Sequence, residues 1–129
     1  MRAGINLENK SEKKQYLGCY NDVINNIRCI DVKINVIRGE MDVIDDDDDL
    51  RRYLDYLIAQ KKSLEAVAKN ARKKILASIY EIDDYTTAQV LSDIYIKGMT
   101  IDDTAADVGY SVRHTYRILS RGIDSIAMG

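Results

Sequence analysis

The sequence predicts an all-α protein, in which a long antiparallel helical hairpin precedes a C-terminal domain of three shorter helices. Three observations predict this class. The chain of 129 residues contains no Pro and only seven Gly, so few residues interrupt helices. Apolar residues recur at alternating steps of three and four over long segments. No β-branched segment is bracketed by turn residues in the way that a sheet requires. We expect two domains, a helical hairpin at 1–82 and a C-terminal domain at 83–129.

The first long segment predicts a helix over about 10–38. Its apolar positions keep a heptad spacing for three repeats, which is typical of a helix that packs along another helix. Gly39 follows the last of them and suits the position just past a helix end. The positions are Tyr16, Tyr20, Val23, Ile27, Ile30, Ile34 and Ile37.

The second long segment predicts a helix over about 50–81, with Asp49 as its N-cap. Lys61 is the one polar residue in its apolar seam, and a polar seam residue can set the register or the partner of a helix pair. A short connection between two long helices favours an antiparallel hairpin. The seam positions are Leu50, Leu54, Leu57, Lys61, Leu64, Ala68, Ala71 and Ile75.

The connection at 40–49 carries seven acidic residues in ten. A calcium-binding EF-hand loop needs Gly at its sixth position and Glu at its twelfth, and counting from Asp45 these positions hold Leu50 and Tyr56. We therefore interpret 40–49 as a solvated loop that caps the next helix, with cation binding as the alternative.

Several classes of protein are excluded. Apolar residues make up 46% and charged residues 31% of the chain, which argues against wholesale disorder. No apolar run approaches the roughly 18 residues of a membrane span, and the polar N-terminal segment is unlike a signal peptide. Cys19 and Cys29 would lie about 15 Å apart along one helix, too far for a disulfide. We expect buried thiols in a reducing cytoplasm, with metal ligation as the alternative.

The third part of the chain begins with a helix predicted from Tyr85 to about Lys97. Asp84 can cap its start, and Gly98 can end it. The residues expected on its inner side are Ala88, Leu91, Ile94 and Tyr95.

Two further helices complete a helix-turn-helix pattern. Thr100 can cap a short helix, Ile101–Val108, which Gly109 ends. Ser111 can then cap a longer helix over about 112–127. A short helix, a turn that contains Gly and a longer helix are typical of helix-turn-helix proteins. Ala105 would provide the small side chain where the two helices cross.

The last helix is strongly amphipathic. Arg113, Arg117 and Arg121 share one face at spacings of four residues, and His114 lies near its edge. Arginines on such a helix can bond guanine edges in the major groove, or phosphates. The hydroxyls of Ser111 and Thr115 are expected to bond phosphates. The alternative is a solvated face without a ligand. The apolar face carries Val112, Thr115, Ile118, Leu119, Gly122, Ile123 and Ile126.

Residues 95–117 carry a resemblance to a known family. They read YIKGMTIDDTAADVGYSVRHTYR, which resembles the C-terminal region of ArpU-like phage transcriptional regulators and, more distantly, sigma factor region 4. The resemblance implies double-stranded DNA as the partner. By position, it assigns DNA binding to Thr100, Ser111, Val112, Arg113, His114, Tyr116, Arg117 and Arg121. The chain departs from the pattern at Gly122, where Ala is common, and in the acidic residues Asp102, Asp103 and Asp107.

The sequence therefore predicts a sequence-specific DNA-binding transcriptional regulator of phage or prophage type, located in the cytoplasm of a bacterial host. The hairpin would hold a homodimer together or dock on RNA polymerase. The alternative is a helical protein-interaction module, an inhibitor or adaptor whose helix-turn-helix does not bind DNA. No enzymatic site, cofactor site or metal site is expected, because no nucleophile–base pair or phosphate-binding Gly-rich loop is visible. Net charge is −2, but segment 51–74 holds eight basic and two acidic residues, which could contact phosphates or only form a solvated face.

Overall fold

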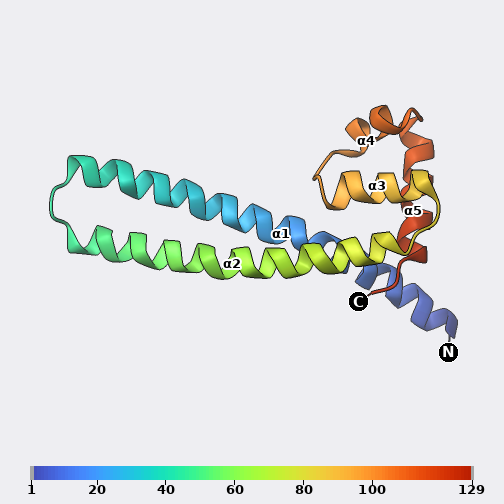
Figure 1. Ribbon diagram of the computed structural model, residues 1–129, viewed down its shortest axis with the longest axis horizontal. Coiled ribbons are helices and arrows are strands. Elements are labelled where there is room, and N and C mark those ends of the chain that lie inside the picture. Colours follow the sequence, from blue (N-terminus) through green and yellow to red (C-terminus); the bar gives the residue numbers. More distant parts are fainter. Residues whose placement is uncertain (1, 129) are drawn as a thin grey trace. The chain divides into compact units, whose positions relative to one another are not determined.

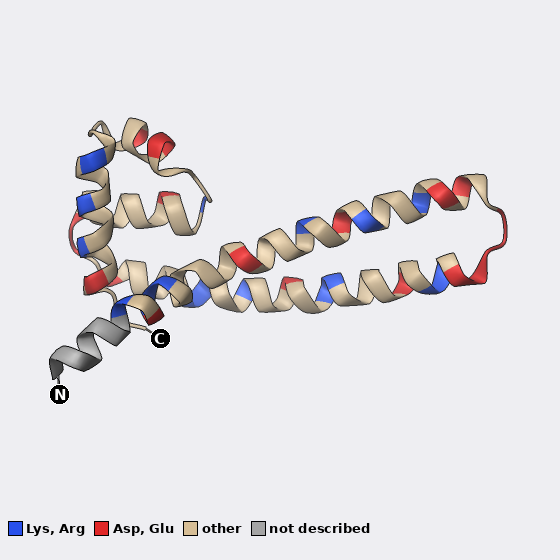
Figure 2. Ribbon diagram, turned by 180° about the vertical axis from the view of Figure 1, so that it is seen from behind, with Lys and Arg blue, Asp and Glu red and all other residues tan. Residues whose placement is uncertain are grey.

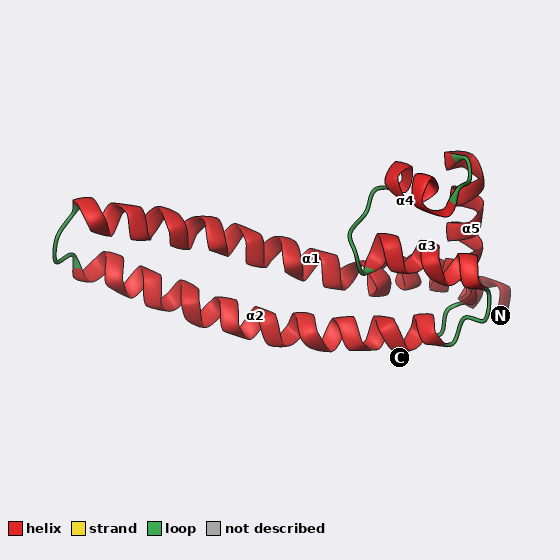
Figure 3. Cartoon of the chain, turned by 45° about the horizontal axis from the view of Figure 1, so that its top comes forward, coloured by secondary structure: helices red, strands yellow, loops and turns green. Residues whose placement is uncertain are grey.

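The computed structural model describes the backbone of residues 2–128 and the side chains of residues 10–128. That part of the chain contains five α-helices and no strand, which confirms the all-helical class (Figure 1). Only short loops separate the helices, as Figure 3 shows. Within the described residues, no helix combines the length and apolar character that a bilayer span needs. The helices are α1 (Arg2–Val43), α2 (Asp48–Tyr80), α3 (Tyr85–Tyr95), α4 (Ile101–Val108) and α5 (Val112–Ser125).

The chain forms two compact units, and both long helices contribute to each. The middle unit is Asp22–Asn70. The terminal unit joins Met1–Asn21 with Ala71–Gly129. The sequence placed its boundary at 82/83 instead. The division differs because the first part of α1 and the last part of α2 share a hydrophobic core with α3 and α5.

In the middle unit, the segments of α1 and α2 lie side by side and bury a narrow apolar seam (Figure 1). Ile30, Ile34 and Leu57 are its buried residues. Lys61 lies at the edge of this seam, where its Nζ is 2.7 Å from Oδ1 of Asp31 on α1. This hydrogen-bonded ion pair raises the pKa of Lys61. The polar seam residue is therefore matched by an acid on the other helix, which the heptad pattern did not identify.

The ends of the long helices differ from the predicted ones. Gly39 does not end α1, which continues to Val43 because Gly39 does not adopt a left-handed conformation. α2 begins at Asp48, before the predicted cap Asp49. The capping carboxylate is that of Asp47, whose Oδ1 accepts the backbone N–H groups of Asp49 at 2.9 Å and Leu50 at 3.2 Å. Since any of the adjacent aspartates could cap, the composition alone did not determine which one does.

The two cysteines are both free thiols, but they are not both buried. Cys19 is half-buried and packs against the core of the terminal unit. Cys29 is exposed, so its predicted burial is wrong. The reason is helical phase: Ile27, Ile30 and Ile34 occupy the buried side of α1, and Cys29 falls outside it.

The terminal unit has the larger core. Polar contacts join α1, α2 and the segment after α5. The hydroxyls of Tyr16 and Ser78 are 2.9 Å apart, and Ser78 donates to the carbonyl of Ala127 at 2.6 Å. α3, α4 and α5 contact one another pairwise. The buried core residues come from four helices and the segments after α3 and α5: Leu17, Ile75, Ile79, Leu91, Ile96, Ile123 and Ile126.

α3 and α5 are each shorter than predicted at their C-terminal ends. α3 stops at Tyr95 rather than Lys97, and the backbone N–H groups of Ile96 and Lys97 both bond the Ser92 carbonyl. α5 stops at Ser125 rather than Ala127, because Ile126 adopts an extended conformation that places its side chain in the core. After the end of α3, Gly98 turns the chain toward α4 with a φ of 70°.

Gly122 lies where α5 closely approaches α3. A Cβ atom at this position would lie 2.8 Å from Cγ2 of Thr87 and 3.2 Å from Cδ1 of Leu91. The absence of a side chain therefore has a packing reason, which outweighs the weaker helix propensity of Gly.

A carboxyl group is buried where α3 meets α4. Asp93 is fully buried, and its Oδ1 accepts a hydrogen bond from Nε2 of Gln89 at 2.8 Å. Nζ of Lys97 lies 3.5 Å from the same oxygen, whereas Oδ2 has no protein donor. Burial, together with the neighbouring Asp107 carboxyl, raises the pKa of Asp93.

Candidate nucleic-acid interface

The backbone around α4 and α5 is fixed by three local contacts, all at predicted residues. Thr100 accepts the backbone N–H three residues on, at 3.1 Å, and so caps α4. Gly109 adopts a φ of 80° and donates its N–H to the carbonyl of Ala105, which ends α4. Ser111 accepts the N–H of His114 at 3.1 Å and caps α5. The start of α5 is therefore well defined.

The inner face of α5 is buried against α3 and α4. Ile118 and Ile123 are almost fully buried on α5, and Ala105 of α4 is also buried, as its small side chain predicted. Thr115 is fully buried and donates its hydroxyl to the Ser111 carbonyl at 2.8 Å. This hydroxyl is inaccessible to a phosphate, so the predicted phosphate contact of Thr115 is wrong. The side chain instead helps to hold the first turn of the helix.

The outer face of α5 carries most of the predicted DNA-binding residues. Arg113 and Arg117 are exposed, and Tyr116 is 55% exposed. Val112, expected on the apolar face, is 38% exposed. Figure 2 shows basic residues at intervals along α5, and acidic residues on α4. One exposed surface therefore combines cationic and aromatic side chains.

His114 lies at the edge of this face and is half-buried. Its ring meets that of Tyr110 edge-to-face, with centroids 4.7 Å apart. It also lines a shallow hollow of about 430 Å³ together with Arg117, Ser120 and Arg121. Two guanidinium groups, an imidazole and a hydroxyl thus border one space, which is a donor set suited to an anion.

Arg121 also faces acidic residues. It lines a second hollow, of about 610 Å³, with residues of the loop between α2 and α3, including Glu81, Asp83 and Asp84. The hydroxyl and backbone N–H of Thr87 lower the pKa of Asp84, and the charge of Arg121 adds to this effect. Arg121 therefore differs from Arg113 and Arg117 in having an internal electrostatic partner.

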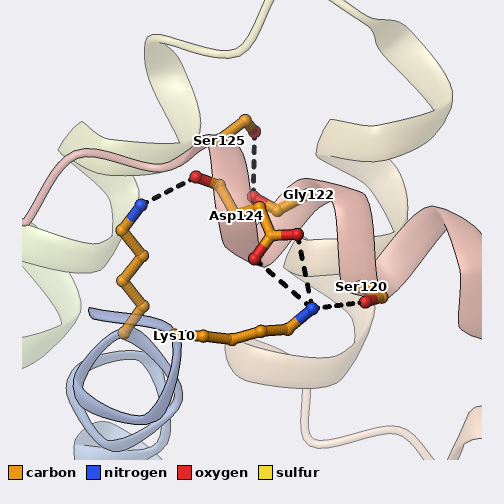
Figure 4. Close-up of polar contacts among 6 residues, drawn as sticks. Lys10, Ser120, Gly122, Asp124 and Ser125 are labelled. Atoms are coloured by element: carbon orange, nitrogen blue, oxygen red, sulfur yellow. Dashed lines mark hydrogen bonds and ion pairs between the residues drawn. The ribbon is translucent and has the colours of Figure 1, made fainter. Parts of the chain in front are cut away.

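Two lysines from α1, which the sequence did not single out, reach the C-terminal end of α5 (Figure 4). Nζ of Lys10 is 2.6 Å from Oγ of Ser120 and 3.3 Å from the Asp124 carboxylate. Lys13 donates to the Asp124 backbone carbonyl at 2.7 Å. In the sequence these two lysines were recognisable only as part of a basic cluster. The local pattern of a helix does not reveal which distant helix a side chain contacts.

The described side chains include no group of three or more His, Cys, Asp or Glu residues arranged to hold a metal ion. No protein-family model matches the chain, and neither the curated proteins nor the solved structures include a match.

Proposed function

We propose that this chain is a sequence-specific DNA-binding transcriptional regulator of phage or prophage type, which acts by binding rather than by catalysis. In this proposal α3, α4 and α5 form a sigma factor region 4-like helix-turn-helix domain, and α5 is the recognition helix. The remainder of α1 and α2 forms a helical hairpin. Double-stranded DNA is the partner of the outer face of α5.

The observation that carries the proposal is the exposed arginine face of α5. Arg113 and Arg117 lie in the first two turns, where a recognition helix reaches base edges in the major groove. Each guanidinium can form two parallel hydrogen bonds with O6 and N7 of guanine. Tyr116 lies between them in sequence and offers ring contact and a hydroxyl. The capped start of α5 would hold these side chains in a fixed position relative to the base edges.

The hydroxyls and remaining basic residues suit the DNA backbone. Thr100 and Ser111 are exposed at the starts of α4 and α5, and each hydroxyl retains a proton to donate to phosphate after accepting its capping bond. His114 and Arg121 border the anion-suited hollow beside Arg117. Asp102 and Asp103 are exposed in the first turn of α4 and would repel phosphates, so only the Thr100 hydroxyl at the start of α4, and not the turn that follows it, should approach the DNA backbone.

The test is selection of bound duplexes from a random pool with the full chain. We expect an enriched motif with wild type, and its loss with Arg113→Ala/Arg117→Ala. The matched control is Arg28→Ala/Arg38→Ala, which removes two exposed arginines from α1 in the middle unit. The proposal fails if no motif is enriched at low salt, or if the control variant loses the motif equally.

A second candidate function is that of a protein-interaction module, which the middle unit favours. Val32, Val36, Tyr53 and Tyr56 are each more than half exposed, at 62%, 59%, 58% and 67%. With Ile37, Leu57 and Lys33 they line an apolar hollow of about 370 Å³. Exposed contiguous apolar surface of this kind marks interaction sites.

We propose that a second copy of the chain covers this apolar face, giving a homodimer through the hairpin. The four exposed side chains would contribute roughly 400 Å² per copy, a large part of the ~800 Å² that each partner of a stable complex buries. Sedimentation of wild type and of Val36→Lys/Tyr56→Lys tests this. A dimer that the variant converts to a monomer supports the pairing. A wild-type monomer contradicts it and leaves a different protein, such as RNA polymerase, as the partner of the hairpin.

A further inference from the structure

The outer face of α5 continues in a line beyond its arginines. Arg113, Arg117, Ser120 and Asp124 are spaced by four, three and four residues, so they lie within about 60° of one another around the helix. The first two are basic, whereas the last two are a hydroxyl and a carboxylate. Along this line, positive charge therefore gives way to a hydroxyl and a carboxylate toward the C-terminal end, and Arg121 lies to one side of it.

α1 supplies positive charge at that end. The Nζ atom of Lys10 lies between Ser120 and Asp124, 2.6 Å from the hydroxyl and 3.3 Å from the carboxylate (Figure 4). Lys13 is held beside it through the Asp124 carbonyl. The carboxylate is thus neutralised by Lys10, and Lys13 leaves a net positive charge at the end of the stripe.

The length of the stripe determines what it can contact on DNA. Eleven residues separate Arg113 from Asp124, and a helix rises about 1.5 Å per residue, so the two positions lie about 16 Å apart. The major groove is only about 12 Å wide. If α5 crosses the groove with its first turns at the bases, its C-terminal end reaches the phosphates at the edge of the groove.

We propose that Lys10, Lys13 and Ser120 form a phosphate-contact site at the C-terminal end of α5, through which α1 helps to hold the DNA backbone. This inference rests on the proposed DNA-binding function and names an additional part of the same surface. Lysine ammonium groups and serine hydroxyls are ordinary phosphate ligands. The site carries no base readout, so it should affect affinity and salt dependence but leave the preferred motif unchanged.

The experiment measures binding of a labelled mixed-sequence duplex of about 24 base pairs by fluorescence anisotropy, at salt concentrations from about 50 to 200 mM. Lys10→Gln/Lys13→Gln is compared with Arg28→Gln/Lys33→Gln, which changes net charge equally in the middle unit. Each phosphate contact contributes about 0.9 to the slope of log affinity against log salt. We expect the first variant to lose about 0.9 to 1.8 of this slope and the control to lose none.

Two further measurements separate binding from folding. Lys10→Arg/Lys13→Arg should retain the slope, since arginine also contacts phosphate. Melting curves of every variant show whether the terminal unit is intact at the assay temperature. A lower melting temperature with an unchanged slope would overturn the inference, because the lysines would then only fasten α1 to α5.

The outcomes also separate this inference from the function on which it rests. Loss of the selected motif in Arg113→Ala/Arg117→Ala, with an unchanged slope in Lys10→Gln/Lys13→Gln, overturns the phosphate site alone. Absence of any duplex binding by wild type at the lowest salt overturns both. A reduced slope with the same selected motif supports the site.

Discussion

Gly122 offers a sharp test of the packing between α3 and α5, because two opposing effects meet at one position. Within a helix, Ala is more favourable than Gly by about 1 kcal/mol. The added methyl group would lie 2.8 Å from Cγ2 of Thr87 and 3.2 Å from Leu91. Thr87 is not free to move, because its hydroxyl bonds Asp84 at 2.6 Å, and Leu91 is fully buried.

Overpacking of a fixed core typically costs about 1–3 kcal/mol. Since both neighbours are constrained, we expect the upper part of that range, and a net destabilisation of about 1–2 kcal/mol for Gly122→Ala after the propensity gain. For a unit of this size, each kcal/mol lowers the melting temperature by roughly 4–8 °C. Urea denaturation and thermal melting, followed by circular dichroism, would measure both quantities.

Gly18→Ala is the matched control in the same unit. An added Cβ at Gly18 has no neighbour within 4 Å, so only the propensity gain remains and the variant should be more stable by up to about 1 kcal/mol. Thr87→Ser removes the clashing Cγ2 and keeps the hydroxyl, so it should recover part of the stability of Gly122→Ala. Equal stabilisation by both alanine variants would refute the close approach of α3 and α5.

Three further predictions concern polar groups. The pKa of Asp93 is raised in the folded state, so protonation of Asp93 favours folding. This contribution to the free energy of unfolding is fully present below the pKa of the unfolded state. It is lost as the pH rises through the pKa of the folded state. Asp93→Asn should therefore gain stability relative to wild type as urea denaturation is repeated from acid to neutral pH, and a pH-independent difference would contradict the burial of the charge beside Asp107. Ser111→Ala should cost about 1 kcal/mol in the same assay, while Ser111→Asn should cost little, since Asn also caps helices; equal losses would argue against the capping role. Exchange of the pair, Lys61→Asp with Asp31→Lys, should restore thermal stability that either change alone lowers; no recovery would show that the pair does not stabilise the seam.

The sequence predicted the N-caps of the three shorter helices most accurately, because the role of a capping residue depends only on its neighbours in the chain. Asp84, Thr100 and Ser111 each cap the helix that was expected to follow, and each does so with the N–H three residues on. Gly109 adopts the left-handed conformation expected at a helix end. Local chemistry decides such positions, because a cap and its partner are neighbours in the chain.

Prediction failed where several residues could serve equally or where distant segments meet. Asp47 rather than Asp49 caps α2, and Gly39 lies within a helix that continues past it. The burial of Asp93 depends on α4, and the contact of Lys10 depends on a segment more than a hundred residues away. Helix periodicity identifies a face but not the element that covers it, so these features required the folded structure.

The terminal unit is discontinuous in sequence, and this fixes the order in which a growing chain can complete it. Leu17 leaves the ribosome more than a hundred residues before its core neighbours Ile123 and Ile126. The middle unit contains all of its own core residues and can assemble during translation, whereas the proposed DNA-reading surface must wait until α5 has been synthesised. A nascent copy, or one terminated before α5, would therefore present the proposed dimerisation surface without the proposed DNA-binding surface.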